Sequence, residues 1–246
     1  LNTINFTRYT TGVTQPGLVP VGLDEESVKP VYANFNKTKH CIILGQAQKG
    51  KTNVLKLMIN HMLVQGAESV GIFDSFDRGL SSYASEEKSV YIETKEQISD
   101  WAAQVEEQLS VREKDYLNAI QHGKTDIEFS PIVLAVDGYS RFAQTLDNSL
   151  QERMARLMNN GSHLGFSVIV TGSNNELTKG YDSLTAEIKQ IRQAIVLMKK
   201  SEQTLFTLPY DRKEAEIQPG YGYYVINGKE LKIQIPLCAT ERKVLA

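Results

Sequence analysis

A glycine-rich segment constrains the fold of this sequence more than any other feature. Residues 45–52 read GQAQKGKT and match the pattern G-x-x-x-x-G-K-[ST] at every fixed position. Residues 40–44 (HCIIL) form a short apolar run before the segment, and residues 53–65 carry apolar side chains at helical spacing after it. Strand, glycine loop and helix in this order predict a loop whose backbone amides hold phosphate groups. The alternative is a glycine-rich turn that only joins a strand to a helix, and such a turn requires none of the fixed residues.

The same pattern predicts the ligands of the loop. Backbone amides of residues 46–51 are expected to surround a polyphosphate, assisted by the partial positive charge of the helix N-terminus. Lys51 would contact the β and γ phosphates, and the Thr52 hydroxyl would bind Mg²⁺. ATP and Mg²⁺ are therefore the predicted ligands. The predicted nucleotide-binding residues are Gly45, Gln46, Ala47, Gln48, Lys49, Gly50, Lys51, Thr52 and Asn53.

Short apolar runs alternate with helical patterns along the rest of the chain. Strands are predicted at residues 69–73, 89–92, 131–136, 166–170 and 194–198, and helices at 95–122, 146–161 and 184–191. This alternation predicts an α/β fold with a doubly wound, mostly parallel sheet that is covered on both faces. Asn227-Gly228 lies between two apolar runs and predicts a C-terminal β-hairpin. Residues 1–38 are expected to form lead-in strands and turns, and residues 39–246 the main part of one structural domain.

Composition narrows the class of protein. The chain has 246 residues, enough for one large core, and its 27 basic and 29 acidic residues give no global basic surface for nucleic acid. No apolar stretch approaches the ~20 residues of a membrane-spanning helix, so the chain is expected to be soluble. Cys41 and Cys238 each lie in an apolar run, which favours buried thiols over a disulfide. A start at Leu1 suggests a piece of a longer protein.

A second apolar strand ends in a carboxylate. Residues 131–136 (PIVLAV) lead to Asp137, which is predicted to hold Mg²⁺ beside the phosphate loop. Asp137 could instead be an ordinary cap in an Asp-Gly turn. In ATPases of this class the next residue is a glutamate that activates water, but here it is Gly138, so a general base worth ~10²- to 10⁴-fold in rate is missing. Substitute bases would be Asp74, Asp77 or Glu176, and hydroxyls that could sense the γ-phosphate are Thr171 and Ser173.

Other residues give weaker signals. The four histidines show no spacing typical of a zinc site. Trp101 and Tyr116 lie on the long predicted helix, where an aromatic face is expected either to pack in the core or to form a docking groove for a partner helix.

With these motifs placed, the chain resembles the FtsK/SpoIIIE-like family of ring-forming motor ATPases, which have a RecA/FtsK-like P-loop fold. The likeness runs from about residue 21 to about residue 236. It includes the lead-in VGLDEESVKPVYANFNKTKHCIILGQAQKGKT, the segment FDSFDRG and the closing hairpin YGYYVINGKELKIQIP. More narrowly, the chain is similar to the last ATPase module of EssC/EccC proteins, which carry several modules in tandem behind a membrane anchor in type VII secretion. Distal modules of those proteins are often degenerate, in agreement with Gly138.

The resemblance implies a soluble module at the cytoplasmic face of the cell membrane, attached to the membrane only through the rest of the full-length protein. Its implied partners are neighbouring ATPase modules of the same chain or ring and small helical WXG-type secretion substrates. Nucleic acid is not an expected partner, because the DNA-reading domain of DNA-pumping relatives is missing. In the family, an arginine from the long helix reaches the nucleotide of the adjacent subunit, and Arg112 is the matching candidate. Arg112 could instead be a solvated charge paired with Glu107 or Asp115.

Three readings of function follow from these residues. In the first, the chain binds ATP and Mg²⁺ with weak or no hydrolysis and contributes to substrate recognition or regulation of a secretion machine. In the second, it is an active ring-forming DNA or protein translocase whose glutamate is supplied elsewhere. In the third, it is a structural adaptor that no longer binds nucleotide.

Overall fold

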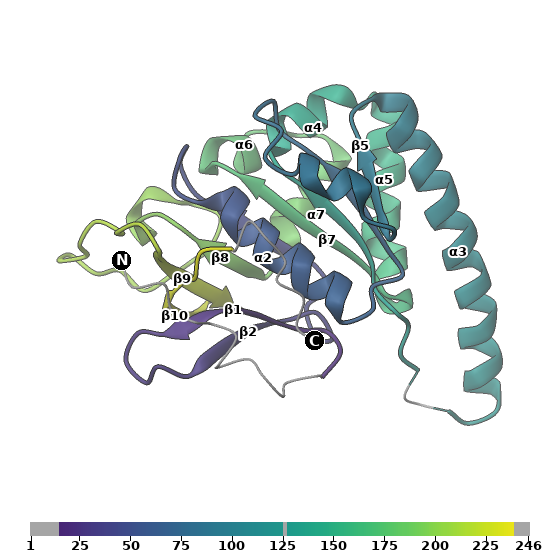
Figure 1. Cartoon of the computed structure of the whole chain (residues 1–246), viewed down its shortest axis with the longest axis horizontal. Helices are drawn as coiled ribbons and strands as arrows, with labels where there is room; N and C mark the ends of the chain where they lie inside the picture. Colours follow the sequence, from purple (N-terminus) through teal and green to yellow (C-terminus); the bar gives the residue numbers. More distant parts are fainter. Residues whose placement is uncertain (1–14, 125–126, 239–246) are drawn as a thin grey trace.

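A ten-stranded mixed sheet organises the chain in the computed structural model, which describes residues 15–124 and 127–238 (Figure 1). The strand order is β2-β1-β10-β9-β8-β3-β7-β6-β4-β5. The strands are β1 (Leu18–Asp24), β2 (Pro30–Asn34), β3 (Cys41–Leu44), β4 (Ser69–Phe73), β5 (Ser89–Ile92), β6 (Ile132–Val136), β7 (Phe166–Gly172), β8 (Gln193–Val196), β9 (Tyr221–Ile226) and β10 (Lys229–Gln234). The α-helices are α2 (Lys51–Val64), α3 (Lys95–Gln121), α4 (Tyr139–Thr145), α5 (Asn148–Gly161), α6 (Asn174–Thr178) and α7 (Ser183–Gln190). Short 3₁₀ helices are η1 (Ser81–Ser85), η2 (Ser162–Leu164) and η3 (Lys200–Glu202).

The sheet has a parallel part and an antiparallel part. Strands β8, β3, β7, β6, β4 and β5 run parallel, and the crossovers that connect them contain helical segments. Hairpin β9–β10 adds to β8 in antiparallel fashion, and hairpin β1–β2 continues the sheet beyond β10. The predicted α/β fold, with a mostly parallel sheet and an antiparallel C-terminal hairpin, is confirmed. The lead-in contributes two strands to this same sheet, while residues 1–14 and 239–246 lie outside the described part of the chain.

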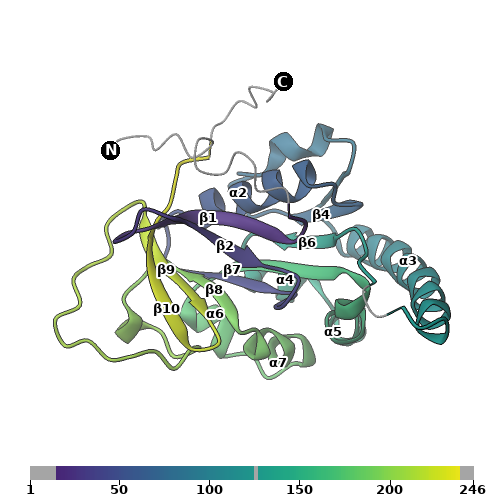
Figure 2. The ribbon, with the colours of Figure 1, turned by 90° about the horizontal axis from the view of Figure 1, so that it is seen from below.

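Apolar side chains cover both faces of the sheet, because neighbouring residues of a strand point to opposite faces. Within β3, Ile42 and Leu44 belong to one core, whereas Cys41 and Ile43 belong to the other. Helix α2 covers the second of these faces, and α3, α5 and α7 pack on the first; Figure 2 shows α2 and α5 on opposite sides of the sheet. Two-sided burial explains why the parallel strands read as continuous apolar runs.

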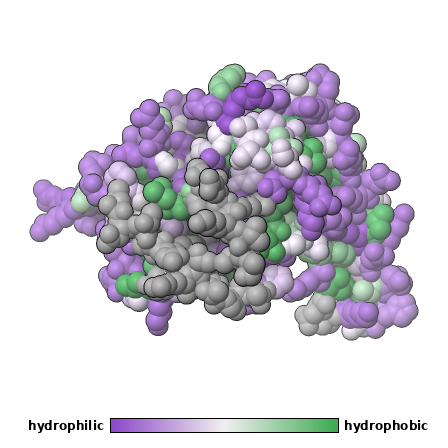
Figure 3. Space-filling view, in the orientation of Figure 1, coloured by the Kyte–Doolittle hydropathy of each residue, from purple (hydrophilic) through white to green (hydrophobic). Residues whose placement is uncertain are grey.

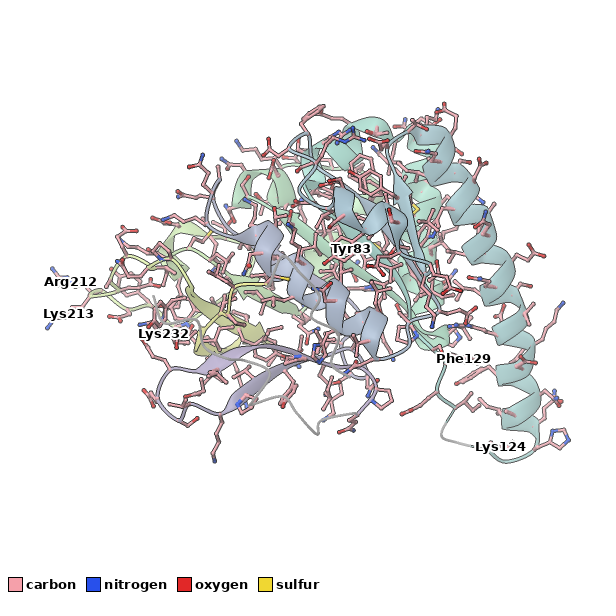
Figure 4. The ribbon with its side chains drawn as sticks, viewed as in Figure 1. Tyr83, Lys124, Phe129, Arg212, Lys213 and Lys232 are labelled. Atoms are coloured by element: carbon pink, nitrogen blue, oxygen red, sulfur yellow. The ribbon has the colours of Figure 1, made fainter. Side chains whose placement is uncertain are left out.

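The long helix α3 is fixed to the sheet by Trp101. Its ring lies over Gly71 of β4, where a Cβ atom would come within 2.6 Å of the ring. The side chain of Trp101 is 2% exposed, so the interpretation as core is the correct one for this residue. Beyond Trp101 the helix extends along the edge of the domain toward Lys124 (Figure 4).

The surface seen in Figure 3 is mainly hydrophilic, with smaller apolar areas between the polar side chains. Arg212 and Lys213, at the tip of the loop between η3 and β9, point away from the body of the molecule (Figure 4). None of the helices in the described ranges combines the length and the apolar character needed to cross a bilayer.

Candidate nucleotide-binding site

The glycine-rich segment forms a loop between β3 and α2, at the carboxyl edge of the parallel strands. Gln48 and Gly50 have φ values of 60° and 91°, which places both in the left-handed region. Gly50 is the N-cap of α2 and offers no side-chain cap to its first amides. Uncapped amides at a helix N-terminus form a binding site for anions. The loop therefore has the geometry expected of a phosphate-binding loop.

The buried carboxylate of Asp137 lies at the start of α2, where strands β3, β7 and β6 end. Asp137, after β6, is 3% exposed, and its two oxygens accept hydrogen bonds from Thr52 Oγ1 and Thr171 Oγ1, each at 2.7 Å. Thr171 Oγ1 in turn accepts from Gly138 N at 2.9 Å. Strand β7 lies between β3 and β6, so Thr171 is well placed to join the two sides of the site. The structure thus brings together Thr52 and Asp137, and it adds Thr171.

The oxygen atoms of Thr52 and Asp137 fit Mg²⁺, which prefers hard oxygen ligands and takes only one or two of them from the protein when phosphates and water supply the rest. Among the described residues there is no cluster of three or more His, Cys, Asp and Glu side chains that could form a metal cage. The donor set therefore suits a metal that arrives with a nucleotide.

Lys51 lies folded over its own loop. Its Nζ donates to the carbonyl of Gln46 at 2.7 Å. Burial lowers the pKa of the Lys51 ammonium, and the nearby carboxylates of Glu176 and Asp137 partly oppose that change. A cation held by a backbone carbonyl inside a phosphate-sized loop can exchange that contact for a phosphate oxygen at little cost in geometry.

Gly138 occupies the position where a catalytic glutamate is expected, and two of the three candidate replacement carboxylates are engaged in other contacts. The oxygens of Asp74 accept from Ser75 N, Leu80 N and the Tyr91 hydroxyl, at 2.7 to 2.8 Å. Glu176 accepts from Ser173 N at 2.6 Å in the capping box of α6. Both carboxylates are therefore engaged in shaping their own loops, and Ser173 serves as a helix cap. Asp77 is exposed in the loop after β4.

A pocket of about 160 Å³ lies beside the phosphate loop, and sequence patterns did not reveal it. One side is formed by Gln48, Lys49 and Gly50 of the loop with Asn53 and Val54 of α2. The other side is formed by Leu197, Pro219, Gly220, Tyr221, Ile235 and Leu237. These residues come from three distant segments, so no local pattern joins them. A mostly apolar pocket next to a phosphate site suits the base or ribose of a nucleotide.

Two predicted site residues are engaged elsewhere. The side-chain amide of Asn53 bonds the backbone of Pro236 and Cys238. Arg112 is 7% exposed and lies at the amino edge of the sheet, where it donates to the carbonyls of Leu164 and Ser130. The phosphate loop is at the opposite, carboxyl edge. The guanidinium also pairs with Glu68 rather than with Glu107 or Asp115, so Arg112 is not the solvated helix-face charge of the second interpretation, and its role toward an adjacent subunit stays a prediction.

Comparison with known proteins places this site in a family. The chain is 54% identical over 230 residues to the ESX secretion system protein YukB of Bacillus subtilis (strain 168), an alignment that spans 93% of this chain and 15% of YukB. A solved structure of the cytoplasmic domain of EssC has a TM-score of 0.91 and 47% identity, and covers 94% of this chain and 46% of that one. The chain belongs to the EccC/EssC family of type VII secretion proteins as an ATPase domain.

More distant similarity concerns the fold of this EccC/EssC domain. Thermomonospora curvata EccC (ATPases 2 and 3), solved in complex with a signal sequence peptide, has a TM-score of 0.69 and 22% identity over 92% of this chain and 41% of that one. No protein-family model matches the chain. The chain spans about 15% of the length of the first two curated relatives it matches.

Proposed function

We propose that this EccC/EssC domain binds ATP with Mg²⁺ and hydrolyses it weakly or not at all. The observation that carries the proposal is a buried Asp137 held between Thr52 and Thr171, followed by Gly138 instead of a carboxylate. The first part of this arrangement can orient a metal-bound triphosphate. The second part lacks the base that would activate water. The proposed site can therefore bind ATP without hydrolysing it efficiently.

Each residue has a defined task in this proposal. The loop amides and Lys51 would hold the phosphates, and Thr52 and Asp137 would hold Mg²⁺, which supplies charge neutralisation when bound. Thr171 keeps the Asp137 carboxylate oriented and joins β7 to the site. Arg112 is assigned no contact with the nucleotide of its own domain, because its guanidinium is bound at the other edge of the sheet.

The proposed role is regulatory. In the long relatives the domain would pass its nucleotide state to neighbouring ATPase modules or to recognition of a secretion substrate. Two findings support this: the chain corresponds to a small part of the curated relative, and an EccC protein with two ATPase modules has been solved with a signal sequence peptide. The partners proposed are therefore adjacent modules and small helical WXG-type substrates.

Calorimetry with MgATP, combined with an assay of phosphate release, tests the proposal. Wild type is expected to bind MgATP and release little phosphate, and Lys51→Ala is expected to lose the binding. Rapid release by wild type would favour the motor, and absence of binding would favour the adaptor. A synthetic signal peptide titrated with and without MgATP tests the regulatory part, since equal affinity in both conditions would contradict it.

A further inference from the structure

The last described residues of the chain lie against the helix that follows the phosphate loop. Ile235 N donates to the carbonyl of Gly220 at 2.7 Å, and this bond extends the pairing between the ends of β10 and β9. The chain then leaves the sheet and reaches Asn53, in the first turn of α2. In Figure 1 the yellow segment beyond β10 runs toward α2. The segment 235–238 is thus in contact with the helix that begins at the phosphate site.

Asn53 holds this segment with both ends of its side-chain amide. Its Nδ2 donates to the Pro236 carbonyl at 3.0 Å, and its Oδ1 accepts from Cys238 N at 2.8 Å. The reversed amide would place N–H against N–H and oxygen against oxygen, so the two bonds fix its orientation. Alanine supplies neither group, and aspartate supplies only the acceptor. Asn53 therefore makes the backbone hydrogen bonds that a neighbouring strand would make if this segment were still in the sheet.

A second asparagine continues the contact along α2. Asn60 lies two helical turns after Asn53 and on the same face. Its Nδ2 contacts Cys238 Sγ at 3.2 Å, and its Oδ1 accepts from the Tyr83 hydroxyl at 2.7 Å. Figure 4 labels Tyr83 beside the helix. The contact at Asn60 is remote from the phosphate loop, whereas Asn53 is the residue directly after Thr52.

The segment also forms one wall of the pocket beside the loop. Ile235 and Leu237 line this pocket together with Gly50, and Leu237 is 71% exposed. A flat aromatic ring in the pocket would remove part of the Leu237 side chain from water, which is favourable for both groups. The wall depends on the path of the backbone between Pro236 and Cys238, and Asn53 holds that path at both ends.

We infer that Asn53 is a positioning residue that ties segment 235–238 to the first turn of α2 and so builds the wall against which the base of a bound nucleotide rests. This inference rests on the proposed nucleotide binding and adds the element that recognises the base. A base that contacts the held segment stabilises it, and by linkage the held segment strengthens binding of the base. A polyphosphate without a base occupies the loop and leaves the segment unchanged.

Two ligands distinguish the contribution of the phosphate loop to binding from the contribution of the pocket wall. Magnesium tripolyphosphate reports the phosphate loop alone, and MgATP reports the loop and the pocket together. With calorimetry on the whole chain, Asn53→Ala is expected to weaken MgATP binding by roughly tenfold, because two hydrogen bonds that shape the pocket are lost. Its affinity for magnesium tripolyphosphate is expected to stay within about twofold of wild type, since removal of a side chain that does not face the phosphates leaves the loop amides in place. Asn159→Ala, at an exposed asparagine of α5, is the matched control and should change neither affinity.

A second variant and a second measurement test the inference independently, in case Asn53→Ala disturbs the fold as a whole. Leu237→Ala alters an exposed side chain and is expected to weaken only MgATP. Hydrogen exchange at Cys238 N should slow in wild type with MgATP but not with magnesium tripolyphosphate. Equal loss of both ligands in Asn53→Ala, or no loss of either, would overturn the role of Asn53 while leaving the proposed function intact. Failure of wild type to bind either ligand would overturn the proposed function and this inference with it.

Discussion

At the scale of single residues, the site depends on backbone conformation as much as on side chains. Gly138 follows Asp137, the carboxylate proposed to hold Mg²⁺, with φ 90° and ψ 82°, a left-handed conformation that glycine adopts without strain. Its amide donates to Thr171 and so helps to orient the hydroxyl that contacts Asp137. Gly138 therefore has a structural role in this turn. It also leaves the site without a base at this position.

A substitution at Gly138 tests that reason. A Cβ atom there would meet only Ser75 Cβ, at 3.9 Å, so the expected cost is backbone strain and not a clash. Gly138→Ala should lower the free energy of unfolding in urea by roughly 1–2 kcal/mol. Gly138→Asn should lose less, because asparagine tolerates the left-handed region better than alanine. Equal stability of wild type and the alanine variant would show that this turn relaxes freely.

At the scale of elements, the sequence predicted what local patterns encode. The helical pattern at residues 95–122 corresponds to α3, Lys95–Gln121. Asp137 meets Thr52 because the parallel strands β3, β7 and β6 end at one edge of the sheet. Contacts between distant segments were not predictable in this way. Asn53 and Pro236 are 183 positions apart, and the partner of the Arg112 guanidinium, Leu164, lies in a different crossover. Periodicity fixes which face of a helix is buried, but not which carbonyls an arginine meets there.

The position of Arg112 yields a prediction about α3. Its guanidinium joins this helix to the amino edge of the sheet through Leu164, Ser130 and Glu68, and it lies 5.3 Å from the ring centre of Phe129. Arg112→Ala leaves two carbonyls without a donor and should lower the free energy of unfolding by roughly 2–4 kcal/mol.

Calorimetry completes the test of Arg112. The affinity of folded Arg112→Ala for MgATP should equal that of wild type, because the two sites lie at opposite edges of the sheet. Arg156→Ala is the matched control: this arginine is 64% exposed on α5, so its loss should cost well under about 1 kcal/mol. Normal stability of Arg112→Ala, together with loss of any phosphate release that wild type shows, would instead support the interpretation as a trans-acting arginine.

At the scale of the whole molecule, the ring of His40 joins strand β7 to helix α5. Its Nδ1 accepts from Val168 N of β7 at 3.0 Å, and its Nε2 lies 3.1 Å from the carbonyl of Met158 in α5. This pattern requires the neutral ring with the proton on Nε2. A proton added to Nδ1 would face the N–H of Val168. The folded structure therefore disfavours the charged ring.

Because the folded protein disfavours the charged ring, its free energy of unfolding depends on pH over a defined range. Burial, the main cause, lowers the pKa of His40 from 6.5 to about 4. Between these values the unfolded chain binds a proton that the folded chain does not, so stability falls as the pH falls from 6.5 and levels off below about 4. The full effect is roughly 3 kcal/mol. His40→Gln should flatten this part of the unfolding profile measured in urea, while His122→Gln, at an exposed histidine, should retain it. An unchanged slope in His40→Gln would mean that His40 does not cause the pH dependence. The wild-type ring would then take up a proton in the folded chain as readily as in the unfolded chain.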